Sequence, residues 1–165
     1  MSYQEKRTIV SIASGFIVLA AYCIYAFGRV AQGIVSGDDL HFWAKTMLVF
    51  IGIGIAVTII IQILFHIAFA IGIAIRNKLT DASCDDKDIE KQIQAETVED
   101  ERDKMIELKS MRFGFAFAGI GFVAGLAWLA WNGSPAVMLN ILYLSFCVGS
   151  LLEGFVQFHH YRRGR

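Results

Sequence analysis

Three polar side chains stand at helical spacing inside a long apolar stretch. Thr58, Gln62 and His66 are four residues apart, so in a helix they share one face. An ionisable group inside a membrane is costly and normally points toward other helices rather than toward lipid. The stripe predicts either a site for a ligand, a proton or an ion, or a neutral histidine that hydrogen-bonds another helix as a packing element.

A second polar face lies in the last apolar stretch. Its members recur every three or four residues, which makes one continuous helical face: Asn140, Tyr143, Cys147, Ser150, Gly154 and Gln157. Glu153 flanks this face and needs a partner such as Arg112 or His66; the alternative is an interfacial acid paired with arginine. The candidates for holding a ligand or an ion are therefore Thr58, Gln62, His66, Asn140, Ser150 and Glu153.

The longest polar segment spans residues 76–112 and divides the chain into two hydrophobic halves. It holds 8 of the 15 basic and 11 of the 15 acidic residues, and residues 99–104 are a run of charge before an apolar stretch. A weak apolar stripe indicates a partly amphipathic helix that continues into that stretch. The segment is either a solvated face or a surface that docks a soluble partner or a second copy. The docking candidates are Glu99, Glu101, Arg102, Asp103, Lys109 and Arg112.

A stripe of small residues runs along the third apolar stretch. Gly114, Ala118, Gly121 and Gly125 are spaced by four, three and four residues, so they lie on one helical face. Small side chains let another helix approach closely. We expect a packing seam, either within the bundle or between copies.

No arrangement of residues predicts catalysis. The sequence has no GxSxG, HExxH, P-loop or GxGxxG pattern, and no EF-hand. Cys23, Cys84 and Cys147 are isolated, which argues against a disulfide framework or a structural metal site. No basic patch with interleaved aromatic residues points to nucleic acid. We therefore expect a non-enzymatic protein without a metal or a cofactor.

The elements that must position these residues are membrane-spanning helices. The 165-residue chain is 56% hydrophobic, and about 20 apolar residues cross a bilayer core. Four stretches qualify: 8–27, 42–75, 113–131 and 136–158. The second would reach about 50 Å against a core of about 30 Å, so it must tilt, break or protrude. Gly52 and Gly54 are the predicted break, and Asp38 or Asp39 the predicted N-cap.

The connection between the last two stretches has the composition of a tight turn. Asn132-Gly133 favours the turn, Ser134 can cap a helix, and Pro135 suits a first helical position. The result is a plan of two helical hairpins.

Orientation follows from lysine and arginine near the span ends. Nine such residues fall on one side of the predicted membrane, and only Arg29 and Lys45 fall on the other. Both termini and the segment 76–112 are therefore expected in the cytoplasm. The predicted location is the plasma (inner) membrane of a prokaryote, as a multi-pass protein.

Residues 99–109, with Arg112 and the hydrophobic hairpin after them, resemble a known group of proteins. The run Glu-Asp-Glu-Arg-Asp-Lys-Met-Ile-Glu-Leu-Lys is similar to the acidic-Arg-acidic motif that precedes the third span in small prokaryotic four-helix membrane proteins of unknown function. The resemblance covers roughly 99–158 and implies no activity. Gln62 and His66 lie outside it.

Together these patterns predict an all-α integral membrane four-helix bundle that forms one transmembrane domain over residues 1–165. The expected function is that of a regulatory or accessory protein, which binds or senses through its bundle and docks through its cytoplasmic segment. The alternative is a small oligomeric transporter or channel that uses the polar faces of the second and fourth helices. The expected partners are the lipid bilayer and either further copies of the chain or a soluble cytoplasmic protein.

Overall fold

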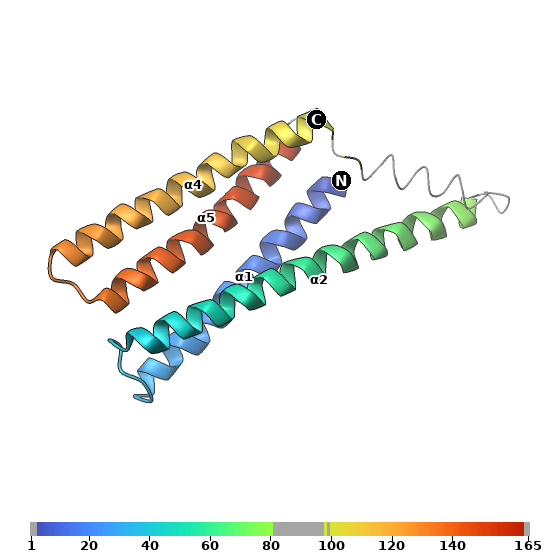
Figure 1. The fold of residues 1–165 in the computed structure, drawn as a ribbon. Helices are drawn as coiled ribbons and strands as arrows, with labels where there is room; N and C mark the ends of the chain where they lie inside the picture. Colours follow the sequence, from blue (N-terminus) through green and yellow to red (C-terminus); the bar gives the residue numbers. More distant parts are fainter. Residues whose placement is uncertain (1–2, 81–97, 99, 164–165) are drawn as a thin grey trace.

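The computed structural model describes residues 3–80, 98 and 100–163, and every element in them is a helix. The helices are α1 (Tyr3–Ala31), α2 (Leu40–Thr80), α4 (Glu101–Ala130) and α5 (Pro135–Arg163) (Figure 1). All four are long enough and apolar enough to cross a membrane. The predicted all-helical class with four potential spans is confirmed.

The helices begin where the sequence supplies caps. Asp39 Oδ1 accepts a hydrogen bond from the Phe42 amide at 3.1 Å at the start of α2. At the start of α5, Asn132 takes a left-handed conformation (φ 58°) and Ser134 Oγ accepts from the Ala136 amide at 3.3 Å. Pro135 is the first helical residue. The predicted caps and turn are therefore confirmed.

The start of α4 lies inside the charged segment. Asp100 is the N-cap and forms a capping box with Asp103, because each side chain accepts a hydrogen bond from the backbone near the other. From Glu101 the helix continues unbroken through Phe113 into the apolar stretch. The predicted continuation of the charged segment into the third span is confirmed; its earlier part, residues 81–97, lies outside the described residues.

Of the three alternatives that the sequence left for the long second span, tilt, break or protrusion, a break at Gly52 and Gly54 is wrong. The helix runs without interruption through Gly52 and Gly54 for 41 residues, about 60 Å at 1.5 Å per residue. Neither glycine is needed for a turn, because both sit among apolar helix residues with little around them. The far half of α2 diverges from the other helices (Figure 1). Most of its exposed side chains there are apolar, such as Ile59, Ile60, Ile63, Leu64, Ile67 and Ile71, and Gln62 and His66 are exposed as well.

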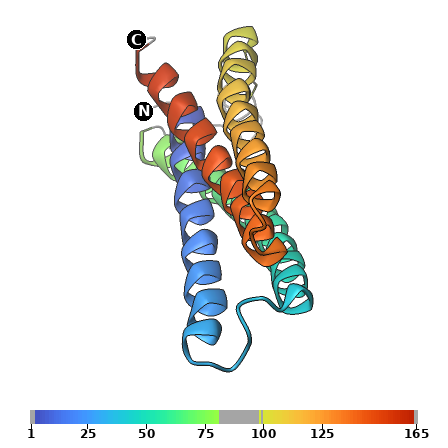
Figure 2. The ribbon, with the colours of Figure 1, turned by 90° about the vertical axis from the view of Figure 1, so that its left-hand side faces the viewer.

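The two chain ends lie at the same end of the bundle (Figure 2). We call this the charged end: it carries residues 3–8 of α1, residues 101–112 of α4 and residues 157–163 of α5. The opposite end, with the α1–α2 and α4–α5 connections, is the loop end. α5 is the central helix, since it packs along α4 and also contacts α1 and α2.

The seam between α4 and α5 is made by small residues. Gly114, Ala118, Gly121 and Gly125 are all buried on α4. A Cβ added to Gly149 of α5 would lie 2.8 Å from the carbonyl oxygen of Gly114, so backbone meets backbone here. The stripe that the sequence places on one face thus lies inside the bundle, against α5.

The loop end holds the apolar core. Its buried members come from α1, α2 and α5: Tyr22, Ala26, Trp43, Met47 and Ala136. The Tyr22 and Tyr143 rings lie with their centroids 4.4 Å apart, and the Trp43 Nε1 donates to the Gly37 carbonyl at 2.7 Å. The core ties α1 and α2 to α5 at the loop end.

Candidate functional site

A polar cavity of about 270 Å³ opens at the charged end. We call it the vestibule. Three carboxylates and one guanidinium line it, together with neutral polar groups from α1, α2 and α5. The lining residues are Gln4, Arg7, Thr8, Ser11, Gln62, Asp103, Glu107, Glu153, Gln157 and Tyr161.

Helical spacing places these groups. Asp103 and Glu107 are four residues apart on α4, and Glu153, Gln157 and Tyr161 follow the same interval on α5. The α1 residues come from its first two to three turns, and α2 contributes Gln62. The vestibule is therefore assembled from the charged-end parts of α1, α4 and α5 and from the middle of α2, and its lining carries an excess of negative charge.

Gln4 is the most confined polar group of the vestibule. Its side chain lines the cavity, is only 8% exposed, and its Nε2 has no hydrogen-bond partner among the described residues. A buried amide without a partner costs about 1–3 kcal/mol. An occupant of the vestibule with an oxygen acceptor would remove that cost.

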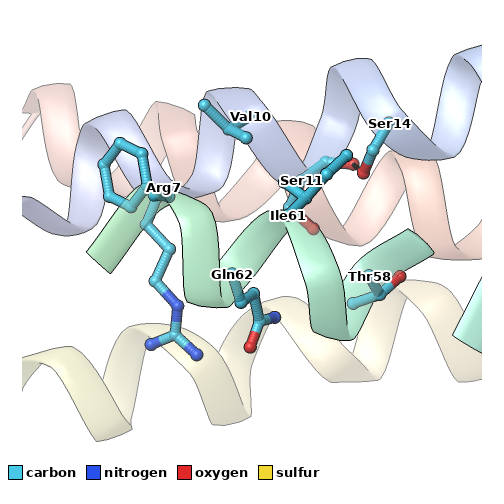
Figure 3. A pocket seen from close by; sticks show the side chains of 8 residues that line it. Arg7, Val10, Ser11, Ser14, Thr58, Ile61 and Gln62 are labelled. Carbon is cyan, nitrogen blue, oxygen red and sulfur yellow. Dashed lines mark hydrogen bonds between the residues drawn. The ribbon is translucent and has the colours of Figure 1, made fainter. Parts of the chain in front are cut away.

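A small cavity of about 10 Å³, which we call the neck, adjoins the vestibule and shares Arg7, Ser11 and Gln62 with it. Figure 3 shows Arg7 and Gln62 at one end of it and Ser14 and Thr58 at the other. Ser11 lines the neck, the vestibule and the next cavity, so the three spaces adjoin one another at this residue.

Beyond the neck lies an apolar cavity of about 660 Å³ between α1, α2 and α5. We call it the crevice. Its size falls within the range of about 300–1,000 Å³ that small-molecule sites occupy. Polar atoms in its wall come from Ser14, Thr58, Tyr143, Cys147 and Ser150; aliphatic and aromatic side chains supply the rest, such as Ile12, Val18, Leu19, Ile55, Phe146 and Leu151.

The space is closed toward the loop end. Tyr22 is fully buried, and its hydroxyl donates to Asn140 Oδ1 at 2.9 Å. The Tyr143 ring packs on Tyr22 and also lines the crevice, so it forms the floor. Vestibule, neck and crevice adjoin one another and are closed toward the loop end; the site is polar at the charged end and apolar deeper in the bundle.

The structure brings four of the six ligand candidates to this site. Gln62 and Glu153 line the vestibule, and Thr58 and Ser150 line the crevice. Asn140 lies in the core instead, where its Nδ2 donates to the Ala136 carbonyl at 2.9 Å.

His66 lies away from the cavities. It is exposed, and its Nδ1 lies 3.4 Å from the Tyr3 hydroxyl at the start of α1. Its place beyond the neck follows from the length of α2, which carries it past the region where the helices enclose space. Tyr3 also contacts Phe65 and Phe69, so this group of side chains fastens the start of α1 to α2.

The docking candidates divide between two sides of α4. Asp103 is half-buried and lines the vestibule. Glu99 lies outside the described residues. The others are exposed: Glu101, Arg102, Lys109 and Arg112.

Several site residues escaped the sequence analysis. Gln4, Arg7 and Thr8 belong to the vestibule, but in sequence they resemble an ordinary polar start to a first span. Arg7 and Ser11 are four residues apart, which is a weak signal of a shared polar face. Glu107 was counted only among the acidic residues of the segment 76–112, since its position opposite Glu153 depends on how α4 packs on α5.

Among the described residues, no group of three histidine, cysteine, aspartate or glutamate side chains could hold a metal ion. Comparison with protein-family models, with curated proteins and with solved structures finds no match.

Proposed function

We propose that this chain is a non-enzymatic membrane accessory protein that binds a ligand in its vestibule and crevice and docks a partner through the start of α4. In this proposal the charged end faces the cytoplasm of a prokaryotic cell. The positive-inside distribution of lysine and arginine supports that orientation.

One observation carries the proposal: the first three turns of α4 face both the ligand site and the surroundings. Asp103 and Glu107 line the vestibule on one side. On the other side Glu101, Met105, Leu108 and Arg112 follow at intervals of four, three and four residues, and all are exposed. We call these four residues the outer stripe.

The outer stripe has the composition of a docking face. Met105 and Leu108 are more than half exposed, between an acid at one end and a base at the other. Apolar contact with charged groups at the rim is a common arrangement in protein interfaces. Because a rigid helix joins the two sides, a ligand that reorients Asp103 and Glu107 would also move the outer stripe.

A photo-crosslinking experiment in cell membranes tests docking. A benzoylphenylalanine at Leu108 should give a discrete protein adduct. The same residue at Phe115, exposed on the same side seven positions further into the apolar stretch, should give none. An adduct at twice the 18.4 kDa of the chain identifies a second copy, and another mass identifies a different protein.

Two variants make the test specific. Reversing charge with Glu101→Lys and Arg112→Glu should abolish the adduct, and Glu153→Gln on α5 should change its yield although Glu153 is not in the outer stripe. Docking through α4 would be contradicted by equal crosslinking yields from positions 108 and 115. It would also be contradicted by an adduct whose yield is unchanged by the charge reversals.

A transporter is the second candidate, and the one-sided access to the site favours it. A transporter exposes its site to one side at a time. The Tyr22–Asn140 hydrogen bond and the Tyr143 ring would then form the closed gate. Uptake of a substrate into liposomes that hold the purified protein would favour this candidate over the accessory role.

A further inference from the structure

The chemistry of the site specifies a class of ligand beyond the function proposed above, on which this inference rests. We propose that the vestibule and crevice bind a bilayer lipid whose headgroup carries an ammonium beside an oxygen acceptor, with the ammonium among Asp103, Glu107 and Glu153 and one hydrocarbon chain in the crevice.

Charge in the vestibule selects the sign of the headgroup. Three carboxylates face the cavity, and Arg7 is the single cationic side chain in its lining. Like charges that lie close together raise each other's energy, and a cation between them is attracted. The excess of negative charge therefore favours an ammonium and disfavours a purely anionic headgroup.

Gln4 points independently to a ligand. Its Nε2 is buried in the same lining and has no hydrogen-bond partner among the described residues. A donor needs an acceptor, and a phosphate or ester oxygen next to the ammonium would supply one. Arg7 lies one helical turn away on α1, where it adds positive charge on the side that receives the phosphate.

The arrangement along the site matches an amphiphile. Polar groups of the vestibule give way, past Ser11, to the apolar wall of the crevice. The vestibule lies at the charged end, which is the level of lipid headgroups when the four helices span a bilayer. The crevice lies deeper, at the level of the hydrocarbon chains. A lipid could occupy both parts without leaving its own leaflet.

Native mass spectrometry of the purified full chain in detergent tests the inference. The probes are phosphatidylethanolamine, its N-acetylated derivative, phosphatidylglycerol and a soluble single-chain alkylamine. Phosphatidylethanolamine should bind about tenfold more tightly than the N-acetylated lipid, because each charge-assisted hydrogen bond is worth roughly that factor.

Substitutions in the vestibule test where the ammonium of the headgroup binds. Glu107→Gln and Glu153→Gln should each weaken phosphatidylethanolamine binding by about tenfold. Glu101→Gln, which removes a carboxylate from the exposed side of α4, is the matched control and should leave binding unchanged. Gln4→Leu should weaken the binding of phosphatidylethanolamine and of its N-acetylated derivative alike, because it removes the donor for the phosphate.

Substitutions in the crevice test whether the hydrocarbon chain of the lipid binds there. Gly54 lines the crevice, and a Cβ there would lie 3.9 Å from Val18, so Gly54→Leu fills the space where the chain would lie. Gly52 on the same helix has nothing within 4 Å of its added Cβ and does not line the crevice, so Gly52→Leu is the control. Only the first substitution should abolish binding.

Three results would overturn the inference. These are equal binding of the lipid and its N-acetylated form, tighter binding of phosphatidylglycerol, and binding of the alkylamine without the lipid. Retention of lipid by Gly54→Leu would also exclude the crevice as the site of the hydrocarbon chain. The crosslink at Leu108 is measured separately, so loss of lipid selectivity with an intact adduct refutes the ligand class and leaves docking standing.

Discussion

The hydroxyl of Tyr22 on α1 donates a 2.9 Å hydrogen bond to Oδ1 of Asn140 on α5, and both side chains are buried. The pair closes the loop end of the site and joins the first hairpin to the second. Both polar atoms of the Asn140 side chain are engaged there, since its Nδ2 also donates to the Ala136 carbonyl. Asn140, which the sequence analysis names as a ligand candidate, thus has a structural role: it joins α1 to α5.

Tyr22→Phe should destabilise the bundle by about 1 kcal/mol, because it removes one interhelical hydrogen bond and keeps the ring packing. Unfolding in mixed micelles, followed by circular dichroism, measures the change. Tyr25→Phe is the control, since Tyr25 is nearly half exposed. Equal stability of the two variants would show that the buried hydrogen bond adds nothing.

Two glycines of the α4–α5 hairpin should respond to alanine with opposite signs. At Gly149 a Cβ would meet the Gly114 carbonyl at 2.8 Å, so Gly149→Ala should cost about 1–3 kcal/mol through overpacking. Gly119 has nothing within 4 Å, so Gly119→Ala should stabilise α4 by about 0.5–1 kcal/mol through helix propensity. The same unfolding assay compares them, and a stabilised Gly149→Ala protein would refute the close approach.

Removing the cap of α4 should fray its charged turns. Asp100→Ala deletes the side chain that accepts from the Glu101 amide at 2.7 Å, at a typical cost of about 1 kcal/mol. Hydrogen exchange at the first turn of α4 should then be about fivefold faster, the equivalent of that energy. Asp100→Ser restores a capping oxygen and should exchange as slowly as the native chain. Unchanged exchange in Asp100→Ala would mean that the cap is not formed.

The proposed orientation predicts which cysteines a membrane-impermeant thiol reagent reaches in intact cells. In a chain whose native cysteines are replaced by alanine, Gln32→Cys in the α1–α2 connection should be labelled from outside. Lys104→Cys, exposed on α4, should be labelled only after the membrane is opened. The reverse pattern would place the charged end outside the cell and remove the cytoplasmic docking role.

Local signals in the sequence decided the helices and their ends. Asp39, Asn132, Ser134 and Pro135 act on residues a few positions away, so their caps and turn could be predicted without knowing the packing. Four apolar stretches of sufficient length likewise identify four potential spans, because crossing hydrocarbon depends on composition and length alone. The small-residue face of α4 was equally readable as a close-approach surface, although not its partner α5.

Only the tertiary structure decided which polar residues meet. The continuity of α2 through Gly52 and Gly54 carried His66 past the enclosed space, whereas Gln62, one turn earlier, lines the vestibule. Gln4 and Glu107 are more than a hundred residues apart, and their shared cavity depends on how α1 and α4 lie beside α5. The spacing of residues determines which side chains share one face of a helix. Which faces then pack against each other depends on contacts between helices, and no single stretch of sequence predicts these.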